Sequence, residues 1–162
     1  MCPKILEPGA ADLDATDLKI LRILQQDADI SMQDLAEKVG LSHTPCWRRI
    51  NQMKEAGVIV GKATIIDGEK VGRGVNALCT VELEHHHEDI LEAFEKAVQD
   101  CPEIVECFLM TGSRDYLLRI MVSSLGEYEQ FMKHKLLHFP GVDTVDTSFA
   151  LKKVKLTTAL PI

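Results

Sequence analysis

The spacing of hydrophobic residues predicts two helices near the start of the chain. Apolar side chains recur every three or four positions over residues 15–27, as on the buried stripe of an amphipathic helix. Asp14 precedes this stretch as an N-cap, and Asp17 puts negative charge in the first turn. A second helix of barely two turns begins after the capping residue Ser31 and ends at Gly40, which suits a left-handed C-terminal stop.

A third helix is expected after a single intervening residue. Two N-caps are open: Ser42, or Thr44 with Pro45 at the first helical position. The helix is expected to reach about Ala56 and to stop at Gly57. A short helix, a glycine turn and a capped helix together indicate a helix-turn-helix.

The periodicity changes after Gly61 and predicts a second, mixed domain. Residues 62–67 alternate as a strand would, and a glycine-rich loop follows. Strand and helix patterns then come in the order β-α-β-β-α-β, the ferredoxin-like arrangement. The predicted fold class is therefore α+β, with an N-terminal helix-turn-helix domain and a C-terminal ferredoxin-like domain. The predicted segments are a flexible arm at 1–12, a helix-turn-helix domain at 13–61, a linker strand and loop at 62–74, and a ferredoxin-like domain at 75–162.

Composition narrows the class of protein. No apolar run approaches the ~18 residues that a membrane helix needs, and the first residues lack the long apolar core of a secretion signal. A cytoplasmic protein is therefore expected. The five cysteines are odd in number and contain no C-x-x-C pair, so we expect mostly small buried hydrophobes. The formal net charge of −7 argues against a general polyanion binder, but it leaves local patches open.

The third predicted helix carries such a patch. Residues 42–56 hold three basic side chains against one acidic one. At roughly 100° per residue, Cys46, Ile50, Met53 and Gly57 cluster on one side, which we expect to be buried. The opposite side carries mostly hydrogen-bonding side chains.

That outward side suits a DNA groove, because Arg pairs with guanine and Asn or Gln with adenine. Arg48 lies at its centre, whereas Arg49 and Lys54 on the flanks suit phosphates. A solvated amphipathic helix is the plain alternative, but the cap and the preceding short helix favour DNA. One patch neutralises few phosphates, so a dimer on double-stranded DNA is expected. The predicted DNA-binding residues are Ser42, His43, Thr44, Arg48, Arg49, Asn51, Gln52 and Lys54.

The same stretch resembles the N-terminal domain of the Lrp/AsnC (leucine-responsive, feast-famine) transcription regulators. It matches their motif L-D-x-x-D-x-x-I-L, then L-S-x-T-P-C-x-R-R, then G-x-I-x-G. The segments "GSRDYLLRIMV" and "FPGVDTVDTSFAL" resemble the family's second half. The "CWRRI" motif and the ending "KLTTALPI" look like the branch that regulates cysteine breakdown. His43 departs from the pattern, because many relatives have proline there.

The resemblance implies an amino-acid effector and no cofactor. The family's effector pocket lies between dimers, around the turn "TGSRDY" and the last strand, and the homodimers assemble into a higher oligomer such as an octamer. Turn amides could take the carboxylate of an amino acid, and Asp115 its ammonium group. Taken without the resemblance, an ordinary polar hairpin turn is the simpler interpretation. The matching positions are Gly112, Ser113, Arg114, Asp115, Thr147 and Ser148.

Other chemistry is less well supported. A small ferredoxin-like enzyme acting on an amino acid is the alternative function, but no nucleophile stands beside a base at a recognisable spacing. His85, His86 and His87 are consecutive and point in different directions, so a tetrahedral metal site is not expected. The pair His134 and His138 lacks the H-E-x-x-H glutamate.

Overall fold

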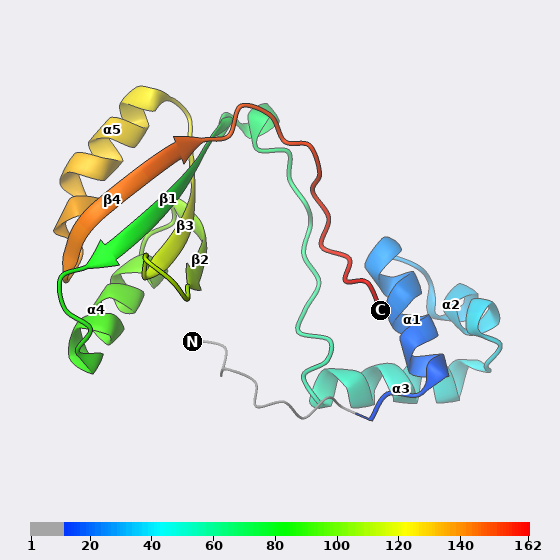
Figure 1. The fold of residues 1–162 in the computed structure, drawn as a ribbon. Helices are drawn as coiled ribbons and strands as arrows, with labels where there is room; N and C mark the ends of the chain where they lie inside the picture. The colour runs from blue at the N-terminus through cyan, green and yellow to red at the C-terminus, as the bar shows by residue number, and fades with distance from the viewer. Residues whose placement is uncertain (1–11) are drawn as a thin grey trace. The chain divides into compact units, whose positions relative to one another are not determined.

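The computed structural model describes residues 12–162, which divide into two units (Figure 1). The first contains the described residues up to Thr64 together with Lys155–Ile162, and the second is Ile65–Val154. The predicted arm at 1–12 lies outside the described residues, apart from Asp12. No helix among residues 12–162 is long and apolar enough to cross a membrane.

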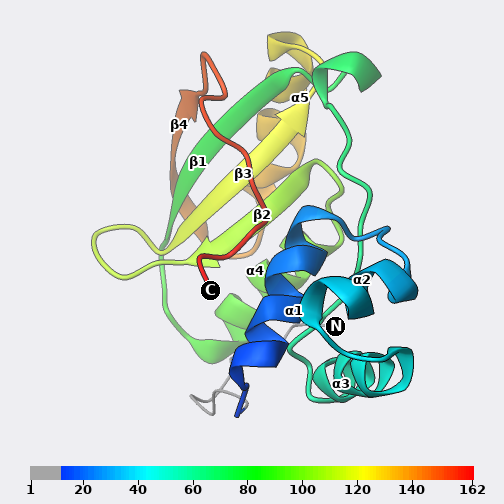
Figure 2. The ribbon, with the colours of Figure 1, turned by 90° about the vertical axis from the view of Figure 1, so that its right-hand side faces the viewer.

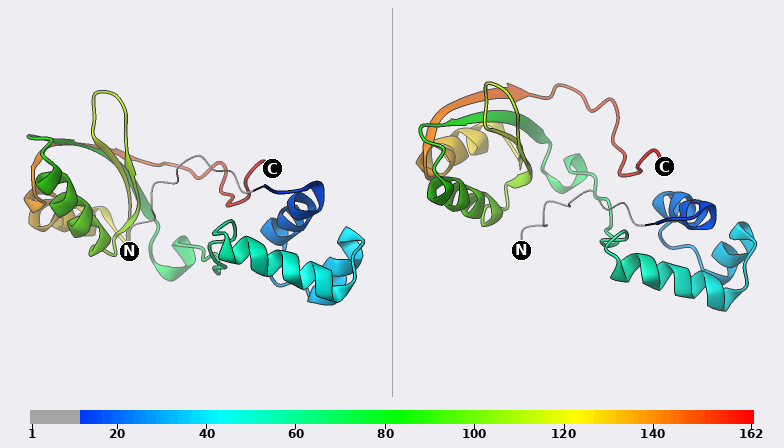
Figure 3. Two further views of the ribbon diagram at one scale, coloured as in Figure 1. Left: turned by 90° about the horizontal axis from the view of Figure 1, so that it is seen from below. Right: turned by 60° about the horizontal axis from the view of Figure 1, so that its bottom comes forward.

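The first unit contains the three expected helices (Figure 3). They are α1 (Ala15–Gln26), α2 (Met32–Val39) and α3 (His43–Glu55). Asp14 and Asp17 form a complete capping box at the start of α1, and the Ser31 side chain caps α2 by accepting from the Asp34 amide. Gly40 ends α2 with φ 76°, as expected of a left-handed stop.

Helix α3 begins at His43, so Ser42 occupies the N-cap position, although its side chain makes no capping hydrogen bond. The alternative start, with Thr44 as cap and Pro45 first in the helix, is wrong. Gly57 lies beyond the helix with φ 72° and is exposed, so it is not part of the buried face. The eight residues of the unit's buried core come from all three helices: Ile20, Leu21, Leu35, Ala36, Val39, Cys46, Ile50 and Met53.

The second unit has the expected β-α-β-β-α-β order. Its main elements are β1 (Val75–Leu83), α4 (Glu88–Gln99), β2 (Ile104–Leu109), β3 (Tyr116–Val122), α5 (Leu125–His134) and β4 (Val142–Phe149). The four strands form an antiparallel sheet in the order β2-β3-β1-β4 (Figure 2). This is the ferredoxin-like arrangement.

The core of this unit lies between the sheet and helices α4 and α5, which cover one of its faces (Figure 1). Ala77, Cys79, Val81 and Leu83 alternate along β1 and are all buried on that face, as their period of two predicted. The opposite face of the sheet is open, and Leu78 on β1 is one of its exposed apolar residues. Three of the four cysteines in the described part of the chain are buried, as expected.

Two connecting segments differ from the sequence-based expectation. Residues 62–67 form no ladder within the described chain, and Ile65 and Ile66 are exposed, so the predicted linker strand is not formed by pairing inside this chain. A strand needs a partner edge, and none pairs with this segment in the described residues. Within the first unit, the segment Lys155–Ile162 contacts α1: the Gln25 side chain accepts from the Leu160 amide at 2.5 Å.

Candidate functional site

Helix α3 presents two different surfaces, as its sequence pattern predicted. Cys46, Ile50 and Met53 are buried against α1 and α2. Arg48 and Gln52 are exposed on the outward side. Among residues 12–162 no carboxylate pairs with Arg48. Its guanidinium is therefore available to an external acceptor.

Arg49 is held differently. Its Nη1 atom donates to Oδ2 of Asp14 at 2.7 Å and to Oδ1 of Asp17 at 2.8 Å. The side chains of Arg49 and Asp17 are 28% and 13% exposed. The hydrogen bond from the backbone amide of Asp17 is the main cause that lowers the pKa of the Asp14 carboxyl below its ordinary value. Loss of solvent around the carboxyl opposes this shift, and the hydrogen bond from Arg49 adds to it. Arg49 thus joins α3 to the capping box of α1, and the phosphate contact expected of it stays a prediction.

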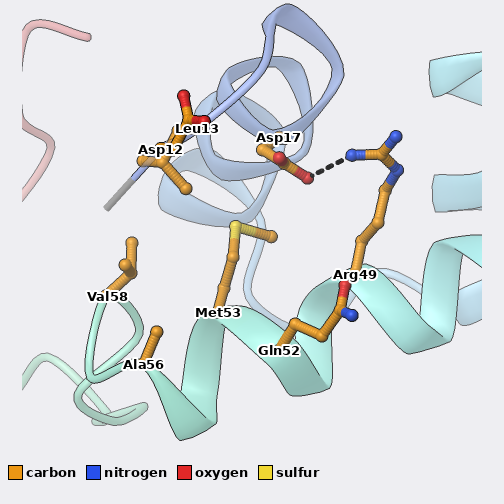
Figure 4. A pocket seen from close by; sticks show the side chains of 8 residues that line it. All are labelled: Asp12, Leu13, Asp17, Arg49, Gln52, Met53, Ala56 and Val58. Atoms are coloured by element: carbon orange, nitrogen blue, oxygen red, sulfur yellow. Dashed lines mark hydrogen bonds and ion pairs between the residues drawn. The ribbon is translucent and has the colours of Figure 1, made fainter. Parts of the chain in front are cut away.

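The same side chain lines a cavity of about 260 Å³ in the first unit (Figure 4). Figure 4 shows Arg49 reaching toward Asp17 across the space above α3, with Gln52 and Met53 on the helix below. The predicted DNA-binding residue Gln52 therefore lies beside the ion pair between Arg49 and Asp17. Of the remaining predicted positions, Asn51 is half-buried and the others are exposed. The exposed ones are Ser42, His43 and Thr44 at the helix start, and Arg48 and Lys54 further along.

The turn between β2 and β3 carries the first four predicted effector residues and stands out from the sheet (Figure 3). Gly112 has φ 128°, a conformation that side chains disfavour. Arg114 donates to Glu82 on β1 at 2.6 Å and also pairs with Asp146 on β4. The turn is thereby joined to the strand that carries Thr147.

Asp115 is largely buried and has two partners. Its Oδ2 accepts from the Leu83 amide at 2.7 Å, and its Oδ1 lies 2.8 Å from Nε2 of His86. Burial by itself would raise the pKa of the Asp115 carboxyl, but the Leu83 amide and His86 outweigh it and lower that pKa. The carboxylate is therefore ionised and already bound within the unit.

Thr147 and Ser148 point to opposite faces of the sheet, because successive strand residues alternate. The Thr147 hydroxyl bonds to that of Tyr128 on α5, which also lies 3.2 Å from the Cys79 sulfur. Burial raises the pKa of Tyr128. Ser148 is exposed and pairs in register with Leu78. The two residues predicted as a pair thus have separate surroundings.

Five partners of the predicted residues were not expected from the sequence: Asp14, Asp17, Glu82, His86 and Asp146. The pairing of Val81 with Tyr116 puts residue 115 beside the end of β1. That register brings His86 within reach of Asp115, and no local signal reveals the register of strands joined by a helix. Among residues 12–162 no group of three or more His, Cys, Asp or Glu could hold a metal ion.

Comparison with known proteins agrees with this geometry. Residues 76–160 match the family model of the Lrp/AsnC ligand binding domain, and residues 13–60 match that of a winged helix-turn-helix DNA-binding domain. The chain belongs to the Lrp/AsnC family. It is a DNA-binding transcriptional regulator with an amino-acid ligand-binding domain.

Lrp/AsnC relatives align along nearly the whole chain. The DNA-binding transcriptional activator DecR of Escherichia coli K12 is 39% identical over 150 residues, covering 93% of this chain and 99% of the relative. The Bkd operon transcriptional regulator of Pseudomonas aeruginosa is 41% identical, covering 94% and 99%. These relatives are regulators, which confirms the regulator prediction over the enzyme alternative.

Solved structures of the family are also similar. A transcriptional regulator of Neisseria meningitidis in complex with L-Met superposes with a TM-score of 0.87 at 37% identity, covering 92% of this chain and 96% of that one. An AsnC family regulator of Agrobacterium tumefaciens gives the same TM-score at 41% identity, covering 92% and 97%.

Proposed function

We propose that this Lrp/AsnC regulator reads DNA with the outward side of α3, and that Arg48 is its main base-reading side chain. The observation that carries this is the contrast between two neighbouring arginines. Arg49 is engaged by Asp14 and Asp17 within the unit. Arg48 is exposed on the same helix with no such partner among the described residues, so its five donors can meet a guanine edge.

The proposed DNA-binding form is a symmetric homodimer, because one α3 offers too few contacts for specific binding. The open face of the sheet supplies a surface for such an assembly. Leu78 and Phe108 are exposed there, and Phe108 pairs in register with Leu117. Covering apolar side chains of this kind stabilises subunit association. Association of dimers into an octamer is the larger assembly that the family resemblance implies.

The proposed effector is a small sulfur-containing amino acid, L-cysteine. Three features support this: the "CWRRI" and "KLTTALPI" segments resemble the branch that regulates cysteine breakdown, a similar regulator was solved with L-Met, and the candidate site carries a carboxylate for an ammonium group. In this proposal amides of the turn take the ligand's carboxylate and Asp115 takes its ammonium group. Ser148 lies on the exposed side of β4.

A thermal-shift screen of the full chain against the twenty amino acids tests the effector directly. A ligand that binds only the folded protein raises its melting temperature. We expect the largest rise with L-cysteine and a smaller one with L-methionine. The largest rise with leucine would overturn the cysteine assignment but leave the DNA-binding regulator standing. No rise with any of the twenty would count against an amino-acid effector.

A further inference from the structure

The side chain of Asp115 is the only carboxylate of the β2–β3 turn, and both of its oxygens have hydrogen-bond partners within the unit. The two partners differ in kind. The Leu83 amide belongs to the backbone at the end of β1, so no side-chain rotation can move it away from Oδ2. The His86 imidazole is 63% exposed and sits on a side chain with two rotatable bonds. Only the position at Oδ1 can therefore be exchanged.

The imidazole of His86 has the same chemistry as the group that it would be exchanged for. A ring N–H, neutral or protonated, donates to a carboxylate oxygen, as does the ammonium group of an amino acid. The Asp115 side chain is 20% exposed, and an ammonium group that bonds to Oδ1 would compete with the His86 ring for that oxygen. Two donors cannot hold that oxygen from the same direction.

We propose that His86 occupies the ammonium subsite at Asp115 in the ligand-free protein, and that an amino-acid effector displaces it on binding. This inference rests on the proposed function. It gives a role to His86, one of three consecutive histidines that DNA binding does not use. His86 is then an internal competitor that weakens effector affinity. It does not select the ligand's side chain; it sets the concentration at which the regulator responds.

The charged neighbours do not supply another competitor. Arg114 pairs with Glu82 and Asp146, and no Lys or Arg in the described part of the chain pairs with Asp115. His85 lies 3.8 Å from Glu84, its own neighbour in sequence. Of the three consecutive exposed histidines at 85–87, only His86 is hydrogen-bonded to Asp115, so His85 is a matched control.

Asp115 is ionised, because its pKa is lowered. Its carboxylate therefore offers Oδ1 either to the His86 ring or to the ammonium group of a ligand through a charge-assisted hydrogen bond.

Calorimetric titration of the full chain with L-cysteine and L-methionine tests the inference. We expect His86→Ala to bind both ligands about two- to fivefold more tightly than wild type, the range of an exposed polar pair. His85→Ala should match wild type.

The outcomes separate the two proposals. Equal or weaker binding by His86→Ala, with ligand bound normally by wild type, overturns the displacement of His86 and leaves the effector proposal intact. Equal gains in His85→Ala and His86→Ala would show a general charge effect and also overturn it. Absence of binding heat in wild type and both variants would refute the effector proposal itself, and the inference with it.

Discussion

Nη1 of Arg49 lies 2.8 Å from Oδ1 of Asp17, so the helix proposed to read DNA is joined by an ion pair to the first turn of α1. Asp17 is also the residue that completes the capping box with Asp14. The Asp17 carboxylate thus caps the start of α1 and also binds Arg49 of α3. The Arg49 guanidinium is bound between α3 and α1, whereas Arg48, one residue earlier, is exposed and in our proposal contacts a DNA base.

We expect Arg49→Ala to weaken binding to all DNA sequences by about three- to tenfold, because α3 loses a positioning contact. If Arg49 only positions α3, the slope of log affinity against log salt concentration stays unchanged, whereas the phosphate contact predicted from the sequence would lower it by about one. Arg48→Ala should instead cost ~1–3 kcal/mol and relax specificity at one operator position per half-site. Binding assays over a salt series and an operator library measure both effects.

Asp17→Asn is the matched variant for this experiment. Its amide oxygen still accepts from the Asp14 amide, but one of the two charges that hold Arg49 is gone, while Asp14 keeps the other. It should reproduce part of the loss seen with Arg49→Ala. A salt slope lowered by about one in Arg49→Ala would assign Arg49 to a phosphate instead. Indistinguishable losses for Arg48→Ala and Arg49→Ala across the library would refute the division of roles.

The helices of the first unit could be predicted from sequence because their signals are local. Asp14, Ser31 and Gly40 each specify a helix end through the backbone beside them, and the structure has these ends within one residue of expectation. The order of strands and helices in the second unit followed equally from alternation along each segment.

What escaped prediction depends on partners distant in sequence. Residues 62–67 alternate like a strand, yet a strand needs a neighbouring edge that alternation cannot supply. The engagement of Arg49 depends on how α1 and α3 pack. The contact of His86 with Asp115 depends on the register of β1 and β3, which no turn between them fixes.

A symmetric dimer constrains the operator. Half-sites should lie about 34–36 Å apart, or a multiple of this, so that two copies of α3 meet one face of the duplex. Inserting five base pairs between half-sites turns one of them to the opposite face. We expect a large loss of affinity in a gel-shift assay, with recovery when ten base pairs are inserted. Undiminished affinity after the five-base-pair insertion would count against the dimer.

Gly141 should be intolerant of any side chain. Its φ is 73°, and an added Cβ would overlap the Cγ2 atom of Ile90 on α4. Gly72 shares the left-handed conformation, with φ 75°, but has open space around it. We expect Gly72→Ala to cost ~1 kcal/mol of unfolding free energy and Gly141→Ala ~2–4 kcal/mol. Equal losses in urea denaturation would show that the overlap relaxes without cost.

Thr147 and Ser148 should differ in what they support. Thr147→Val removes a hydroxyl that bonds to Tyr128 against the core, so it should cost ~1 kcal/mol of stability and leave effector affinity unchanged. Ser148→Ala alters an exposed side chain, so it should leave stability unchanged and weaken effector binding. Thermal melts and calorimetry of both variants distinguish these outcomes. Loss of effector affinity in Thr147→Val alone would reverse the two assignments.

Asp115→Asn tests the residue on which the effector proposal depends. The variant keeps an oxygen that can accept from the Leu83 amide, so the turn should retain its structure. It loses the charge that would pair with an ammonium group, and a hydrogen bond to a charged group contributes ~1.5–3 kcal/mol. Cysteine affinity should therefore fall by about ten- to a hundredfold.

DNA affinity without effector should stay near wild type in Asp115→Asn, because the residue belongs to the second unit and not to the DNA-binding one. Asp143→Asn is the matched control, since Asp143 is exposed on β4 and its side chain bonds to its neighbour Thr144.

Titration of the wild type and both variants with cysteine, alanine, serine and leucine measures the affinities. The same cysteine affinity in Asp115→Asn and wild type would remove Asp115 from the effector site. An equal loss of cysteine affinity in Asp143→Asn would show that the effect comes from the overall charge of the domain and not from a contact with Asp115. A loss confined to Asp115→Asn would identify this carboxylate as the ammonium partner.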